Sequence, residues 1–174
     1  MARIPYFDLE KAPQEYRDML AGRPPLNLYR MLPHATSIAP GFLAMGRGIL
    51  RESALDPKIR EIVILRVGML SDASYELHQH KRVARRVGLS EEKIAALQAG
   101  ADEPVFDHVE SKVIRFTDEV VRNVKATNQA FDVLQSDFSH REIAEIVLTI
   151  GFYMMVCRFL ENFEVDIEPP GVIE

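Results

Sequence analysis

Cysteine is almost absent from this sequence, because among its 174 residues only Cys157 carries a thiol. A single cysteine excludes an internal disulfide, and it excludes the thiolate clusters that bind structural zinc. A chain of this length can bury a hydrophobic core that is stable without either device. We therefore expect an ordinary globular domain that has no covalent or metal cross-link.

The sequence also lacks an excess of positive charge and a long apolar segment. Its formal net charge of −5 argues against general nucleic-acid binding, which needs many cations to displace the counterions of phosphates. The longest nearly continuous apolar run, residues 146–157, is shorter than the roughly 18 residues that suggest a membrane span. Residues 1–11 show neither the apolar core nor the cleavage site of a secretory signal. We expect a cytoplasmic protein that contacts neither nucleic acid nor membrane.

Strand patterns are absent as well, and helical periodicity runs through most of the chain, so the predicted fold class is all-α. Five prolines break residues 1–34 into short pieces, with short helices expected near 14–21 and 26–32. We interpret residues 1–34 as an N-terminal helical arm, packed on its own body or on a neighbouring subunit. Residues 35–174 are then the main helical domain.

Local capping signals place the helices of the main domain. Asp56 followed by Pro57 predicts the start of a buried helix over 56–70, and Gly88 predicts the end of a second helix over 72–87. Ser139 and Glu142 form a capping box that opens a long helix over 139–162. These three helices are the expected core. Further helices are expected over 38–51, 90–99 and 129–135, and a stripe from Phe106 to Val124 predicts one more.

The second helix carries two ionisable residues where apolar ones are expected. Glu76 and His80 are four residues apart and fall on the apolar side, opposite a basic face. A buried carboxylate must be paired, protonated or in contact with water, so the two side chains form a candidate site for proton transfer. Glu61 interrupts the preceding helix and can approach either this pair or later turns. The alternatives are a surface pair or a satisfied buried hydrogen bond, with Glu61 in a structural salt bridge.

A metal site is not expected, although His78 and His80 are close in sequence. Residues two apart on a helix point in nearly opposite directions and cannot easily share one ion. Glu76 and His80 offer two ligands, and no third is evident.

Two motifs resemble the carboxymuconolactone decarboxylase family, which includes the alkylhydroperoxidase D proteins. They are EIVILRVG from Glu61 to Gly68, followed by YELHQH from Tyr75 to His80; EIVLTIGFYMMVCRF over 145–159 resembles a later family helix. The resemblance implies an alkylhydroperoxidase D-like helical bundle and a homo-oligomer: a trimer, hexamer or dimer. In the peroxidase branch a CxxC pair precedes the histidine. Those positions are Ala73 and Glu76 here, so both thiols are missing.

The arrangement Tyr75-Glu76 followed by His80 is similar to the decarboxylase-type branch, although Leu77 stands where that branch often has tryptophan. The resemblance implies a cofactor-free carbon–carbon lyase that acts by proton transfer on a small carboxylated lactone or a related unsaturated acid. His80 is then the general acid or base, Glu76 orients it or shares its proton, and Glu61 tunes the pair. Tyr75 and Arg66 are expected to contact the substrate.

Two other functions are compatible with the sequence. A peroxidase-related protein without the CxxC pair would reduce hydroperoxides through Cys157, although we expect this residue to be a small buried hydrophobe. A binding or scaffold protein would keep the fold without catalysis, and its Glu76–His80 region would be packed solid.

Overall fold

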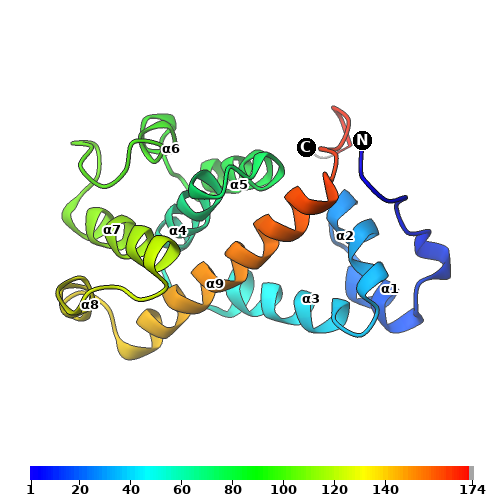
Figure 1. Cartoon of the computed structure of the whole chain (residues 1–174), viewed down its shortest axis with the longest axis horizontal. Coiled ribbons are helices and arrows are strands. Elements are labelled where there is room, and N and C mark those ends of the chain that lie inside the picture. Colours follow the sequence, from blue (N-terminus) through cyan, green and yellow to red (C-terminus); the bar gives the residue numbers. More distant parts are fainter. Residues whose placement is uncertain (173–174) are drawn as a thin grey trace. The chain divides into compact units, whose positions relative to one another are not determined.

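The computed structural model describes residues 1–172, and every regular element in this part of the chain is helical, which confirms the all-α fold class (Figure 1). The α-helices are α1 Gln14–Leu20, α2 Asn27–Met31, α3 Ala39–Arg47, α4 Pro57–Leu70, α5 Ser74–Arg86, α6 Glu91–Ala96, α7 His108–Asn123, α8 Asn128–Gln135 and α9 His140–Phe163. Short helical turns at Leu9–Lys11 (η1), Leu32–Ala35 (η2) and Gly48–Glu52 (η3) complete the list.

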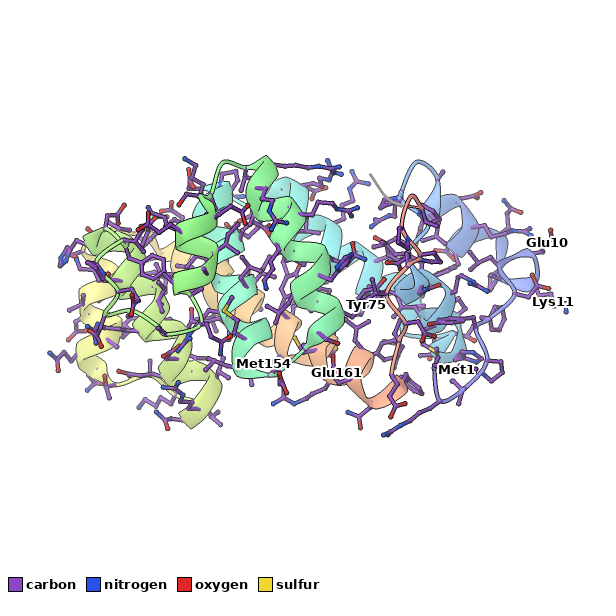
Figure 2. The ribbon with its side chains drawn as sticks, turned by 90° about the horizontal axis from the view of Figure 1, so that it is seen from above. Met1, Glu10, Lys11, Tyr75, Met154 and Glu161 are labelled. Atoms are coloured by element: carbon purple, nitrogen blue, oxygen red, sulfur yellow. The ribbon has the colours of Figure 1, made fainter. Side chains whose placement is uncertain are left out.

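The chain divides into two compact units. The first combines Met1–Glu52 with the segment from Leu160 onward, and the second is Ser53–Phe159. In the first unit the amino-terminal segment, where Figure 2 labels Met1, Glu10 and Lys11, is tied to the carboxy-terminal segment. The Tyr6 hydroxyl donates to Asp166, and the Asn27 backbone N–H donates to the buried Glu168 carboxylate. The predicted division after residue 34 stays a prediction.

Helix α4 is the central element of the second unit. The Asp56 carboxylate accepts the backbone N–H of Lys58 at 2.8 Å, and Pro57 occupies the first turn, so the predicted start is confirmed. Residues 60–68 are all buried, including Arg60, Glu61 and Arg66. Because ionised groups inside a protein are unfavourable alone, each of these three needs a partner of opposite charge.

Helix α5 packs against α4 at close range. A methyl group at Gly68 of α4 would lie 3.1 Å from the Leu77 side chain, so a larger residue there would push the helices apart. Helix α5 ends before Gly88, which has a φ of +88° and confirms the predicted stop. The absence of a side chain at Gly68 therefore permits the close packing of α4 and α5.

The buried side of α5 is more polar than its sequence pattern predicts. It consists of Tyr75, Glu76, Gln79, His80 and Ala84, whereas Leu77, Val83 and Val87 are only half-buried. Leu77 and Val87 border a core cluster that includes Ile62, Leu65, Leu97, Phe106 and Ile114. The core is consequently apolar on one flank of α4 and polar where α5 carries Glu76 and His80.

Helix α7, which packs against α4, is the helix whose prediction needs correction. Its capping box is formed by Asp107 and Glu110, and Ile114 lies in the core. The predicted apolar stripe included Val124, but this residue follows the helix with a φ of +67° and is 89% exposed. Periodicity extended the stripe by one turn because no glycine or proline marks the end of the helix.

Helix α9 begins with the predicted capping box, in which the Ser139 backbone N–H donates to Glu142 at 2.8 Å. Its most apolar 18-residue stretch has a mean hydropathy of 1.8, so by length and composition the helix could cross a membrane. Half of that stretch is buried inside the protein. The apolar stretch of this helix is longer than the uninterrupted run of residues 146–157, because single charged residues do not end an apolar helix.

The turn after α5 provides a test of this packing. Replacing Gly88 with alanine should lower the free energy of unfolding by about 1 kcal/mol, because an L-residue side chain is strained at positive φ. Gly88→Asn is the matched control and should lose less, since asparagine tolerates this conformation. Urea unfolding measures both. If both variants lost the same free energy of unfolding, steric crowding by the added side chain, rather than the positive φ at position 88, would be the cause.

Candidate functional site

The structure brings three of the predicted site residues together. His80 of α5 lies between two carboxylates: its Nδ1 is 2.7 Å from Glu61 Oε2 of α4, and its Nε2 is 3.0 Å from Glu76 Oε1, one turn earlier on α5. Glu61 thus approaches the Glu76–His80 pair rather than the later turns of α5. Each ring nitrogen has its own carboxylate, so the imidazole is held at both ends.

Burial and charge act on His80 in opposite directions. Glu61 is fully buried, and Glu76 and His80 are 4% and 8% exposed. Removal from water lowers the pKa of His80, but the Glu61 carboxylate, helped by Glu76 and by both hydrogen bonds, raises the pKa to about 10. At neutral pH the ring is an imidazolium that donates one N–H to each carboxylate.

Arg60 supplies a second positive charge to this cluster. Its Nε lies 3.5 Å from Glu61 Oε1, and both atoms are buried without a hydrogen-bond partner. The contact is an ion pair whose alignment falls short of a hydrogen bond. With two carboxylates, one guanidinium and one imidazolium, the cluster is formally neutral, which makes its deep burial tolerable.

An aromatic ring from α9 completes the surroundings of His80. The Tyr153 ring stands nearly perpendicular to the imidazole, at 84° with 5.0 Å between ring centroids. This arrangement suits a cationic ring beside an aromatic one. Sequence reasoning missed Tyr153: it lies in the second stretch that resembles the family, but nothing in its spacing links it to His80.

The two predicted substrate contacts have different surroundings. Tyr75 is buried in the first turn of α5, directly before Glu76, and is labelled in Figure 2. The Arg66 guanidinium forms a bidentate ion pair with Asp118 of α7, with N–O distances of 2.5 and 2.7 Å. It also donates a hydrogen bond to the Leu97 carbonyl at 2.6 Å. These contacts give Arg66 a packing role. Substrate contact by Tyr75 and by Arg66 stays a prediction.

The positions of the missing thiols are now defined. Ala73 is the fully buried residue just before α5, and Glu76 lies against the imidazole. Cys157 belongs to α9 and is 1% exposed. A carboxylate therefore occupies the place nearest His80 where the peroxidase motif has a thiol.

No metal-binding group of three or more His, Cys, Asp or Glu side chains occurs within residues 1–172. Glu61 and Glu76 lie at opposite nitrogens of the His80 ring, so the three side chains do not converge on one point. A separate pocket of about 190 Å³ lies in the first unit and involves none of the predicted site residues. It is lined by Pro13, Glu15, Tyr16, Pro33, Thr36, Ala39 and Pro40.

Comparison with known families agrees with the sequence motifs. The model of the carboxymuconolactone decarboxylase family matches residues 38–119, the segment that contains α4 and α5, in agreement with the resemblance that the motifs predict. No curated protein matches the chain.

Solved structures share the fold. A peroxidase-related protein from Ralstonia eutropha JMP134 with an alkylhydroperoxidase AhpD core is 14% identical, with a TM-score of 0.86 over 96% of this chain and 92% of that chain. A peroxidase-related protein from Silicibacter sp. TM1040 is 20% identical, with a TM-score of 0.80 over 95% and 90%. The debrominase Bmp8, in complex with 2,3,4-tribromopyrrole, is 16% identical, with a TM-score of 0.79 over 97% and 94%. At these identities the likeness establishes the alkylhydroperoxidase D-like fold.

The imidazolium between two carboxylates predicts a specific pH dependence of stability. Its pKa rises from 6.5 to about 10 on folding, so its contribution is fully present below pH 6.5 and is lost as the pH rises to about 10. Urea unfolding between pH 6 and pH 10 should show this decline in the wild type and in the exposed-site control His78→Gln. In His80→Gln the decline should be smaller. Parallel curves for all three proteins would contradict a protonated His80.

The packing role of Arg66 is tested by a double-mutant cycle with Asp118. Removing one partner of this largely buried pair should cost about 3–5 kcal/mol of unfolding free energy, because the other charge is left uncompensated. The double variant Arg66→Met with Asp118→Leu should lose much less than the sum of the single losses. Additive losses would show that the two side chains stabilise the protein independently.

Proposed function

We propose that the protein is a cofactor-free acid–base enzyme that removes a carboxyl group from a small lactone acid or a related unsaturated acid. The observation that carries this proposal is His80, a buried imidazolium with a different carboxylate on each nitrogen. A chain of three titratable groups within hydrogen-bond distance can pass a proton from one end to the other.

The geometry refines the roles expected from the sequence. Both nitrogens of His80 are engaged, so a substrate cannot take a proton from the ring without displacing a carboxylate. We assign the contact with the substrate to Glu76, with His80 passing the proton to it. Glu61 anchors the far side of the ring, and Arg60 places a positive charge beside Glu61. Tyr153 stabilises the orientation of His80.

The proposed reaction balances with one proton. The bond between the substrate carbon and its carboxylate breaks, carbon dioxide leaves, and the electron pair remains on the conjugated substrate as an enolate. His80 transfers a proton to Glu76, and Glu76 delivers it to the carbon. The proton is then replaced from water, so each turnover consumes one proton and requires no redox partner.

Two comparisons support a small ring compound as substrate. The family model that matches residues 38–119 is named for the decarboxylation of a carboxylated lactone. A protein of the same fold, the debrominase Bmp8, holds the small ring 2,3,4-tribromopyrrole. Thiol-dependent peroxide reduction has less support in this chain, because Cys157 is buried on α9 and Glu76 stands at a thiol position.

The deep burial of the cluster favours one further candidate, a non-catalytic protein in which Glu61, Glu76 and His80 only hold α4 and α5 together. The catalytic and the structural candidates differ in whether a bound small acid shifts the NMR resonances of His80. In a purely structural cluster, small acids would leave the His80 resonances unchanged.

Turnover on a panel of unsaturated lactone acids, followed by carbon dioxide release, tests the proposal. Glu76→Gln and His80→Gln should each reduce turnover about 10²–10⁴-fold, the usual contribution of acid–base catalysis. His78→Gln, on the exposed side of the same helix, is the control and should keep full activity. Unchanged turnover in His80→Gln rejects the assigned role. Absence of turnover and of any NMR shift at His80 across the panel favours the structural candidate.

A further inference from the structure

The exposed side of α9 is apolar although the opposite side of the helix is in the core. Val147, Leu148 and Met155 are 41%, 54% and 43% exposed. Their spacing places them on one face with Ala144 and Gly151, which are also exposed. Figure 2 marks the second half of this helix with Met154 and Glu161. Large apolar residues gathered on one helix face in water are typical of a contact surface.

We propose that this face of α9, residues 144–158, is where two copies of the chain associate, with their α9 helices antiparallel and crossing at Gly151. The contact is isologous, so each copy contributes the same residues. The proposal specifies one contact surface for the homo-oligomer that the family resemblance implies, and it is independent of the chemistry at His80.

Gly151 is the first argument for a helix as the partner. Glycine inside a helix costs roughly 1 kcal/mol relative to alanine, so its presence in the middle of a 24-residue helix needs a reason. A side chain at this position would meet nothing within 4 Å in the chain itself. The free space therefore lies outside the protomer, where the absence of a side chain lets a second backbone come close.

The charges at the ends of the face determine the direction. Arg141 and Arg158 are both exposed at the borders of the apolar face. A parallel pair would place Arg158 of one copy beside Arg158 of the other, which is repulsive. Antiparallel pairing about Gly151 instead places Arg158 over Ala144 of the other copy, where its stem has room.

The same pairing matches the large side chains. Positions equally far from Gly151 face each other, so Val147 meets Met155 and Leu148 meets Met154 of the other copy. Branched residues thus face flexible methionines, which adapt to the shapes of their neighbours. An antiparallel contact therefore buries the apolar residues of both copies and separates the like charges.

Sedimentation equilibrium on the full chain over a range of concentrations tests the association. The wild type should form dimers or larger even-numbered assemblies, and Leu148→Glu should shift the dissociation constant at least 100-fold. Val133→Glu, at a similarly exposed apolar position on α8, should leave the constant unchanged. A wild type that is monomeric at every concentration, or equal effects of both variants, would overturn the proposal.

The variant Gly151→Leu distinguishes a close helix crossing from non-specific hydrophobic association. It adds apolar surface, so adsorption to a lipid bilayer or to an unrelated apolar partner would become stronger. At a close crossing it should weaken the dimer at least 10-fold instead. Tighter association of Gly151→Leu, or co-flotation of the wild type with neutral phosphatidylcholine vesicles, contradicts the proposal.

Disulfide cross-linking tests the direction. In a Cys157→Ala background, Val147→Cys and Met155→Cys chains are mixed and treated with diamide as the oxidant. The mixed disulfide between positions 147 and 155 should form faster than either symmetric disulfide, because of these three only the mixed pair is juxtaposed in the antiparallel arrangement. Faster symmetric disulfides would indicate a parallel contact and reject the assignment.

Discussion

The negative charge of Glu61, fully buried inside α4, is the constraint on which the candidate site depends. An isolated carboxylate in that position would destabilise the fold by several kcal/mol, so the neighbouring helix must bring it a cation. Helix α5 does so with His80, and α4 itself adds Arg60. The small residue at Gly68 permits the close approach of the two helices. Packing, charge balance and the chemistry of the cluster therefore depend on one another.

Much of the fold can be predicted from the sequence, because several helix ends are determined by residues close to them in the chain. Asp56 with Pro57, Gly88, and Ser139 with Glu142 each act within a few residues, and the structure has a helix end at each place. The stripe ending at Val124 failed because periodicity alone carries no stop signal. The membership of Glu76 and His80 in one buried pair also follows from spacing, since one helical turn separates them.

Contacts between distant parts of the chain could not be predicted in the same way. Whether Glu61 reaches His80 depends on the register of α4 against α5, which is set by the fit of Leu77 beside Gly68. Arg66 was expected at a substrate, but its partner is Asp118, 52 residues later, which no local pattern connects to it. Tyr153 reaches His80 from α9, after a separation of more than seventy residues. In each case three-dimensional packing, rather than residue type, selects the partner.

The replacement of a thiol by Glu76 has a consequence for how such a site recovers after each use. A cysteine pair that has reduced a peroxide is left oxidised, and it stays inactive until another reductant supplies two electrons. A carboxylate beside an imidazolium stores only a proton, and water restores that proton directly. In the proposed reaction the cluster should therefore work at the same rate in oxidising and reducing surroundings, and peroxide should not inactivate it, because neither Glu76 nor His80 carries a sulfur atom to oxidise.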